Sequence, residues 1–497
     1  MTRPNEISLD PEDWDAFAEK AHRSLDSALE HLRGAGDRPW RPVPPEARSD
    51  LEAPLPRRPG DLDEIMTRVE RSLLRYPTGN GHRRFWGWVM GNGTADGMLA
   101  DMLASAMNPH LGGYDQSASI VERQVVDWWA QVMGFPPNSG GLLVSGATMA
   151  NLVGVTVARH VKAGFDVRQQ GLTAGPPLRI YGSAETHSWA EKSCDVLGLG
   201  RDGFRRVEAD HQGRLVLASV RAAIDEDRRR GFRPICVCAN VGTVDTGAID
   251  DLHAVADFCS EEELWFHVDG AFGALLACSE SLKPRIAGLE RADSLAFDLH
   301  KWGYLPYEVG CVLVRDRELQ RSTFRTTADY LNAQGRGILP QPLDFPELGL
   351  QLSRGFRALK VWLSLQLHGL DKIGRVIEQN VDQAQYLVRR IAEEDLLELL
   401  ALAPLNVVCF RYTRPGVDED GLERLNHEIM LRLQEDGIAI PSSTRRAGRF
   451  SLRIAITNHR TRLEDIDVLV ESVLDLGSEL ANSIASDSGS REVVTPV

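Results

Sequence analysis

Short apolar runs alternate with helical segments through the middle of the chain, and this alternation is the strongest constraint on its fold. Strand candidates after about residue 96 are 178–182, 235–241, 264–268, 294–297 and 310–314. Strands that alternate with helices predict an α/β fold with a mainly parallel sheet and helices on both faces. Residues that follow parallel strands gather at one edge of such a sheet.

Two of these runs are followed by residues that can take part in catalysis. The run Trp265-Phe-His-Val-Asp269 is followed by the small residues Gly270 and Ala271, and a later apolar run leads into His300-Lys301-Trp302. A carboxylate and an amine at one sheet edge suit pyridoxal phosphate (PLP), because the amine holds its aldehyde as a Schiff base and the anion keeps its ring nitrogen protonated. An isolated lysine is more often a surface residue, but apolar and aromatic neighbours favour loss of its charge.

A possible phosphate site lies at Ser145-Gly146-Ala147-Thr148, between an apolar run and a helical run. Free N–H groups at a helix start favour an anion, although such residues are often only helix caps. His187 follows the run 178–182 and could stack on a pyridine ring or be a structural histidine. Tyr330 lies in a polar, glycine-containing segment, which is typical of a lid or of a loop with an incidental tyrosine.

Composition narrows the possible partners. A formal net charge of −15 argues against nucleic acid or an anionic membrane as the main partner. No apolar run is long enough to span a bilayer, and the N-terminus lacks the pattern of a signal peptide. The seven cysteines lack metal-ligand spacing. We therefore expect a cytoplasmic protein with free thiols and no metal site.

The chain divides into four predicted regions. Residues 1–95 form an N-terminal arm for dimerisation, with a helix from Asp10-Pro11 to Gly34, a proline-rich extended stretch over 39–59 and a helix over 62–73. Residues 96–354 form the large cofactor-binding domain. Residues 355–482 form a small α+β domain, with helices at 355–369, 371–394, 419–436 and 462–480 and strands at 406–412 and 450–456. The polar tail 483–497 is predicted to be disordered.

Taken together, the His-Val-Asp-x-Ala and His-Lys-Trp motifs at this separation resemble those of the group II PLP-dependent amino-acid decarboxylases, over roughly residues 10–475. The resemblance implies a type I PLP-dependent fold and an obligate homodimer with active sites at the interface. It makes Lys301 the Schiff-base lysine and Tyr330 the donor of a proton to Cα. It assigns cofactor contacts to Gly146, Ala147, Thr148, His187, Thr243, Asp269, Ala271, Asp298 and His300, a basic position of the small domain to Arg453, and substrate contacts to Trp88, Met90, Gly91 and His110.

Three segments depart from the family pattern. Asp298 stands where aromatic decarboxylases have asparagine near the phosphate, and an acid there is repelled unless it is protonated or paired. Val244 replaces the second threonine of a Gly-Thr-Thr turn, which leaves only Thr243. Met90 and Gly91 replace a Pro-Thr pair on the substrate side. The substrate therefore cannot be copied from the family.

The sequence leaves three functions to weigh. The first is decarboxylation of an L-amino acid to an amine and carbon dioxide, with an aromatic or apolar side chain favoured by Trp88, Val89 and Met90. The second keeps PLP but forms an aldehyde by oxidation, or cleaves a carbon–carbon bond as a lyase. The third is an inactive binding protein. Relatives that form aldehydes carry phenylalanine at the position of Tyr330, so the tyrosine favours the first.

Overall fold

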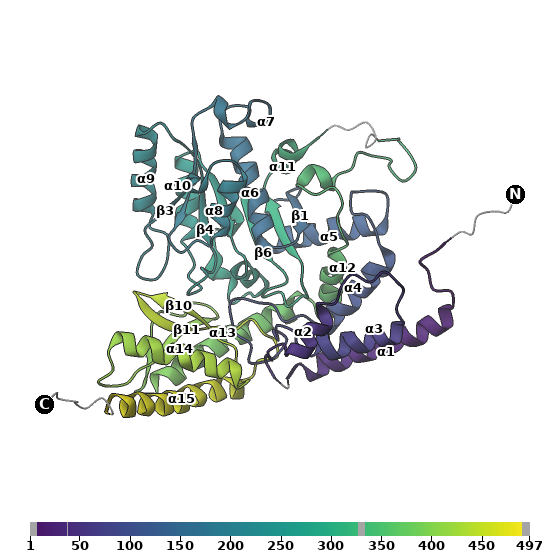
Figure 1. Cartoon of the computed structure of the whole chain (residues 1–497). Helices are drawn as coiled ribbons and strands as arrows, with labels where there is room; N and C mark the ends of the chain where they lie inside the picture. The colour runs from purple at the N-terminus through teal and green to yellow at the C-terminus, as the bar shows by residue number, and fades with distance from the viewer. Residues whose placement is uncertain (1–6, 37, 327–332, 490–497) are drawn as a thin grey trace.

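A seven-stranded sheet forms the centre of the large domain in the computed structural model, which describes residues 7–36, 38–326 and 333–489 (Figure 1). Its strands are β1 (Gly140–Val144), β2 (Leu178–Ser183), β3 (Phe204–Val207), β4 (Arg233–Asn240), β5 (Trp265–Asp269), β6 (Ser294–Asp298) and β7 (Gly310–Val314). They lie in the order β1-β7-β6-β5-β4-β2-β3, and only the pairings that β7 makes with β1 and β6 are antiparallel. The predicted mainly parallel α/β sheet is confirmed.

Helices cover both faces of this sheet. The helices packed against the strands are α5 (Ser117–Val132), α6 (Ala147–Lys162), α8 (Trp189–Val196), α9 (Leu217–Arg229), α10 (Leu252–Glu261) and α11 (Arg317–Phe324). The large domain also contains α4 (Ala95–Met107), α7 (Val167–Gln170) and α12 (Ala358–His368). Val237 and Phe266 pack in a core with α5, α9 and α10, whereas Cys236 and Trp265 pack in a second core with α6 and α8. Adjacent strand residues thus face opposite cores, so both faces are apolar and buried.

The strand register places the chemistry-bearing residues at one edge. β4, β5 and β6 run parallel, with Asn240 opposite Asp269 and Asp269 opposite Ala296. β1 is antiparallel to β7, which is itself antiparallel to β6, so β1 also ends at this edge. The loops that follow these strands therefore converge on one side of the sheet.

The small domain is an antiparallel sheet backed by helices. Its strands are β8 (Leu397–Leu399), β9 (Val407–Tyr412), β10 (Ser442–Arg446) and β11 (Arg449–Ala455), in the order β10-β11-β9-β8. Its helices are α13 (Leu370–Ala392), α14 (Glu419–Glu435) and α15 (Leu463–Gly489). Trp86 also lies in this core and donates its backbone N–H to Ile440 O, so the segment before α4 runs along the small domain. The small C-terminal domain was predicted, and its sheet is confirmed.

The N-terminal helices pair with each other along the lower right of the molecule (Figure 1). They are α1 (Trp14–Arg33), α2 (Pro45–Leu51) and α3 (Leu62–Arg68), and a π-helical turn, Val69–Leu74, extends α3. Lys20 forms an ion pair with Asp63 at 3.0 Å, and Ser27 donates to Glu70. No residue of α1 is buried. None of the helices in the described part of the chain combines the length and apolar composition that a bilayer-spanning segment needs.

Three local predictions were wrong. α1 is capped by Asp13, whose carboxylate accepts two backbone N–H groups, and not by Asp10. The proline-rich arm contains a short helix, α2, which Pro45 starts as its first residue. The short or polar strands β3, β8 and β10 were not expected. α15 ends at Gly489, and the disorder expected for the tail 483–497 stays a prediction.

A buried ion pair joins two parts of the large domain. The guanidinium group of Arg354 contacts Glu122 on α5, and neither side chain is exposed to solvent. Arg354 also donates to Leu111 O at 3.2 Å and to Leu143 O at 2.7 Å. One side chain therefore ties the chain just before α12 to α5 and to β1.

We predict that Glu122→Leu lowers the free energy of unfolding by roughly 3–5 kcal/mol, because it leaves a buried arginine without its partner. Urea unfolding followed by circular dichroism measures the loss. Asp436→Ala is the control, since it removes the partly exposed pair with Arg432 and should change stability by only about 0.5 kcal/mol. Equal losses in the two variants would contradict the importance of the buried pair.

Candidate active site

A cavity of about 620 Å³ lies at the converging strand edge. Its walls come from the loops after β1, β2, β4, β5 and β6, from β10 and β11 of the small domain, and from the segment Trp88–Met90. The residues from the large domain include Ser145, Gly146, Ala147, Thr148, His187, Trp189, Asp269, Ala271, Asp298, His300 and Lys301. Most of the predicted cofactor residues therefore share one enclosed space.

Lys301 is paired with a buried carboxylate in this cavity. Its Nζ lies 2.9 Å from Asp298 Oδ2, and the Asp298 side chain is only 2 % exposed. Burial lowers the pKa of Lys301, but the charge and hydrogen bond of Asp298 outweigh burial, so the pKa lies above its usual value. Asp298 is thus paired with a cation rather than isolated.

Asp269 ends β5 and is held by two donors. The backbone N–H of Ala271 donates to Oδ1 at 3.0 Å, and the indole N–H of Trp189 donates to Oδ2 at 2.5 Å. Hydrogen bonds to a carboxylate favour its charged form. Trp189 was not predicted as a site residue; its position two residues after His187 was the only signal in the sequence.

The start of α6 forms a cradle for an anion. Gly146 precedes the helix and gives it no side-chain cap, and the N–H of Ala147 donates to Asp298 Oδ1 at 2.6 Å. A Cβ atom on Gly310 of β7 would lie 2.7 Å from Gly146 Cα, so only glycine lets the two backbones approach this closely. The backbone N–H groups and dipole of a helix start bind phosphate.

Both histidines of the cavity have a defined tautomer. The N–H of Trp189 donates to His187 Nδ1, and the N–H of Val309 donates to His300 Nδ1, each at 3.1 Å. The proton of each neutral ring is therefore on Nε2. Burial lowers the pKa of His187 and of His300, although Asp269 and Asp298 respectively oppose the shift. Both rings are accordingly neutral near pH 7.

Arg453 on β11 joins the two domains at the wall of the cavity. The side chain is 3 % exposed and donates to Val244 O, to Asp245 O, to Trp88 O at 2.7 Å and to Ser442 Oγ at 3.2 Å. Burial lowers its pKa. Most of its N–H groups therefore hold backbone carbonyls in place, and through them the position of Trp88.

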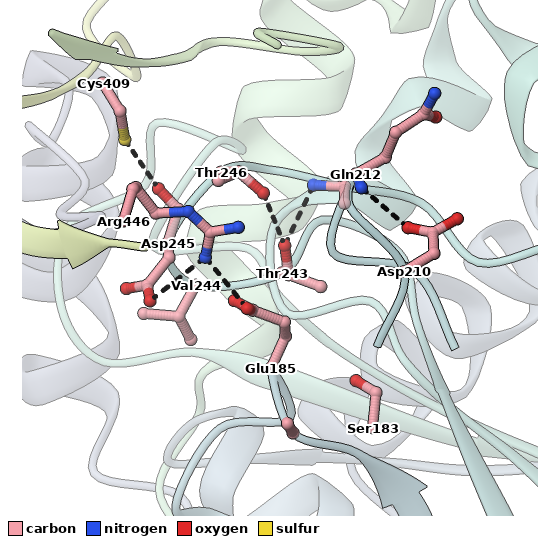
Figure 2. Close-up of polar contacts among 12 residues, drawn as sticks. Ser183, Glu185, Asp210, Gln212, Thr243, Val244, Asp245, Thr246, Cys409 and Arg446 are labelled. Atoms are coloured by element: carbon pink, nitrogen blue, oxygen red, sulfur yellow. Dashed lines mark hydrogen bonds and ion pairs between the residues drawn. The ribbon is translucent and has the colours of Figure 1, made fainter. Parts of the chain in front are cut away.

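A second arginine from the same hairpin ties together two large-domain loops (Figure 2). Arg446 Nη1 lies 2.9 Å from Glu185, two residues before His187, and 3.9 Å from Asp245. The thiol of Cys409 donates to Asp245 O at 3.2 Å. The loop after β4 is thus fixed from the small-domain side.

Only some of the remaining predicted site residues line the cavity. Trp88 and Met90 line the cavity, and Gly91 lies behind it, where a Cβ would overlap His300 O. Thr243 does not line it, because its hydroxyl contacts Thr246 and accepts the N–H of Ala248 within the turn (Figure 2). His110 also lies elsewhere, 3.3 Å from Ser353 Oγ. Tyr330 falls outside the described residues.

Comparisons with known proteins place this geometry in a family. The model of the pyridoxal-dependent decarboxylase conserved domain matches residues 44–413. An aromatic-L-amino-acid decarboxylase of Bacillus atrophaeus is 32 % identical over 88 % of this chain and 90 % of its own length. The chain belongs to the pyridoxal-dependent decarboxylase family, as the motifs predicted, and is a PLP-dependent carboxy-lyase that acts on an amino acid.

Solved structures share the fold. The glutamate decarboxylase domain of a Vibrio parahaemolyticus protein described as a diaminobutyrate-pyruvate transaminase and L-2,4-diaminobutyrate decarboxylase is 26 % identical, with a TM-score of 0.83 over 95 % of this chain and 98 % of its own. An Oryza sativa TDC solved with PLP and tryptamine is 24 % identical, with a TM-score of 0.87 over 95 % of this chain and all of its own.

The cavity fits PLP. A glycine cradle at the start of α6 accommodates a phosphate, Lys301 can bind the aldehyde, and the carboxylate of Asp269, held by Trp189 and Ala271, can pair with a ring nitrogen. Ala271 lines the same cavity and leaves room for a flat ring.

We predict that Gly310→Ala weakens PLP binding at least tenfold, because the new methyl group forces β7 away from Gly146 and Asp298. Titration of the apoenzyme with PLP, followed by tryptophan fluorescence, measures the affinity. Gly355→Ala is the matched control, since a Cβ there meets no atom within 4 Å. Similar affinities in both variants would contradict the close approach.

Proposed function

We propose that this enzyme decarboxylates an aromatic L-amino acid to the amine and carbon dioxide. The observation that carries the proposal is the substrate side of the cavity, where Trp88, Val89 and Met90 form an apolar wall beside Lys301. The 32 % identity to an aromatic-L-amino-acid decarboxylase supports the same class of substrate.

The charges of the cavity also disfavour an acidic side chain. Among the described residues that line the cavity, the lysine and arginine residues are Lys301 and Arg453. Lys301 is needed for the cofactor and is paired with Asp298, while Arg453 is engaged with carbonyl groups. Asp245 and Glu308 also line the wall, and each lies near an arginine, Arg446 and Arg357 respectively. The side-chain carboxylate of an acidic substrate would therefore find no unpaired cation among these residues.

The protein's part in the reaction follows from these positions. Bound PLP supplies an electron-accepting ring that stabilises negative charge at Cα. Asp269, His187 and Lys301 line the same cavity. With PLP bound, Asp269 would keep the ring nitrogen protonated, His187 would stack on one face of the ring, and Lys301 would hold the aldehyde. Arg453 holds Trp88 and the loop after β4 in place at the wall of the cavity. Tyr330, outside the described residues, remains the predicted proton donor to Cα.

We predict that the purified enzyme converts tyrosine, tryptophan or phenylalanine with a kcat/KM at least about tenfold above that for L-glutamate. Amine and carbon dioxide are quantified together, and Lys301→Ala serves as the inactive control. Equimolar amine and carbon dioxide support the proposal. A preference for glutamate overturns the substrate class, whereas ammonia, peroxide and aldehyde as products indicate the aldehyde-forming reaction instead.

We also propose a homodimer with active sites at the interface. α4 presents Leu99, Met102, Leu103 and Met107 on one face, each between 41 % and 51 % exposed in a single chain. Trp14 and Phe17 of α1 are also exposed. Clustered exposed apolar side chains mark a protein interface, and the family resemblance supports a second copy as the occupant.

We predict that the double variant Leu99→Asp/Leu103→Asp shifts the particle from twice the chain mass toward the 55.0 kDa of one chain. Light scattering after size exclusion measures the mass. Val196→Asp is the control, because Val196 is 68 % exposed and ends α8, a helix that Figure 1 shows well apart from α4. A dimer that survives the double change would remove α4 from the interface.

A cytoplasmic location is the last part of the proposal. All seven cysteines are free and buried. Free thiols suit a reducing compartment.

A further inference from the structure

We propose that Asp298 accepts the proton that Lys301 must lose when the PLP aldehyde is bound, and that Asp298 then stays protonated beside the phosphate. The inference rests on the family's cofactor and not on the amino acid that is decarboxylated. It can therefore fail while the proposed substrate class holds, and the reverse is also true.

The starting state is an ion pair. Lys301 Nζ and Asp298 Oδ2 are 2.9 Å apart, within hydrogen-bond distance, and the aspartate is almost fully buried. A protonated lysine has no lone pair with which to attack a carbonyl carbon, so the amine must lose a proton first. Asp298 is the carboxylate already in hydrogen-bond contact with that proton.

The two histidines of the cavity are poor acceptors for this proton. His187 and His300 each use Nδ1 to accept a backbone N–H, so Nε2 of each neutral ring already carries hydrogen. Protonating Nδ1 would break that hydrogen bond and place a cation near Lys301. Tyr307 stacks on His300 at a centroid distance of 4.4 Å, and burial raises its pKa, so it remains a phenol.

The other carboxylates of the cavity have different partners. Asp269 accepts hydrogen bonds from Ala271 and Trp189 and must stay charged for the ring nitrogen. Glu308 is paired with Arg357 at 2.8 Å, and Asp245 lies 3.9 Å from Arg446. Among the described cavity residues, the geometry therefore singles out Asp298.

The phosphate gives a second reason for the transfer. Asp298 Oδ1 accepts the N–H of Ala147, at the helix start that suits a phosphate, and Gly146 and Gly310 bring the backbone close to the same oxygen. A charged carboxylate at this place would repel a phosphate dianion, whereas a neutral carboxyl group can donate a hydrogen bond to it. His300 Nε2, 3.7 Å from Asp298, adds a neighbouring donor.

The step balances in atoms and charge. The proton on Lys301 moves to Asp298, which converts the ammonium–carboxylate pair into an amine and a carboxylic acid. The amine nitrogen attacks the aldehyde carbon, a C=N bond forms and one water leaves. No proton is exchanged with the solvent, so the fraction of reactive amine does not depend on pH while the pair is intact.

The test is the pH dependence of cofactor attachment to the apoenzyme. Growth of the violet absorption band is followed after mixing with PLP between about pH 7 and 9, where the phosphate is a dianion. Borohydride reduction and mass spectrometry confirm the bond at Lys301. We expect a flat rate profile for the wild type. Asp298→Asn should give a rate that rises about tenfold per pH unit, because its lysine must lose the proton to solvent.

Asp293→Asn is the matched control. Asp293 precedes β6 at the strand end opposite Asp298 and accepts the N–H of Phe266 at 2.8 Å. This variant should keep the flat profile. Equal slopes for the wild type and Asp298→Asn overturn the proposal.

Two measurements do not need a folded Asp298→Asn variant. A wild-type rate that itself rises about tenfold per pH unit overturns the proposal, because the proton is then lost to solvent. An infrared difference spectrum, PLP-bound minus apo, should gain the carbonyl stretch of a protonated carboxyl group. Its absence from the wild type also overturns the proposal.

Discussion

The parallel pairing of β5 with β6 is the constraint on which the site depends. With Asp269 opposite Ala296, the end of β5 and the loop after β6 meet at one edge, and the carboxylate of Asp269 shares a cavity with Lys301. Side chains alternate along a strand, so a slip of one residue would turn Asp269 toward the opposite face. The apolar cores on both faces of the sheet oppose such a slip, because it would also turn Phe266 and Trp265 each toward the core on the opposite face.

The large domain could be predicted because its central strands are continuous apolar runs, as buried parallel strands require. β5, β6 and β7 were each located to within a residue or two. β3 and β10 could not be found in this way. β3 is Phe-Arg-Arg-Val and β10 is Ser-Ser-Thr-Arg-Arg, and each lies at the edge of its sheet, where polar side chains reach solvent. Their pairing partners, rather than their own composition, make them strands.

The sequence predicts a site residue well where a backbone motif fixes its position. It predicts a site residue less well where the direction of the side chain decides whether the residue faces the cavity. Asp269, Lys301 and the start of α6 follow directly from strand ends and a helix start. Thr243 has a hydroxyl that could face a cofactor, but the turn uses it internally. Trp189 contacts Asp269 from a different loop, a pairing that depends on the order of β2 and β5 in the sheet and cannot be read from spacing.

The ion pair between Lys301 and Asp298 also affects the reactivity of the lysine before the chain binds its cofactor. An ammonium group does not condense with carbonyl compounds, so the paired lysine is shielded from sugars and other metabolic aldehydes that modify free amines. In a newly made chain, the Lys301 amine is therefore unreactive toward these aldehydes. In the proton transfer that we propose, a dianion at the helix start drives Asp298 to take the proton, and the same requirement would favour PLP over aldehydes that carry no phosphate.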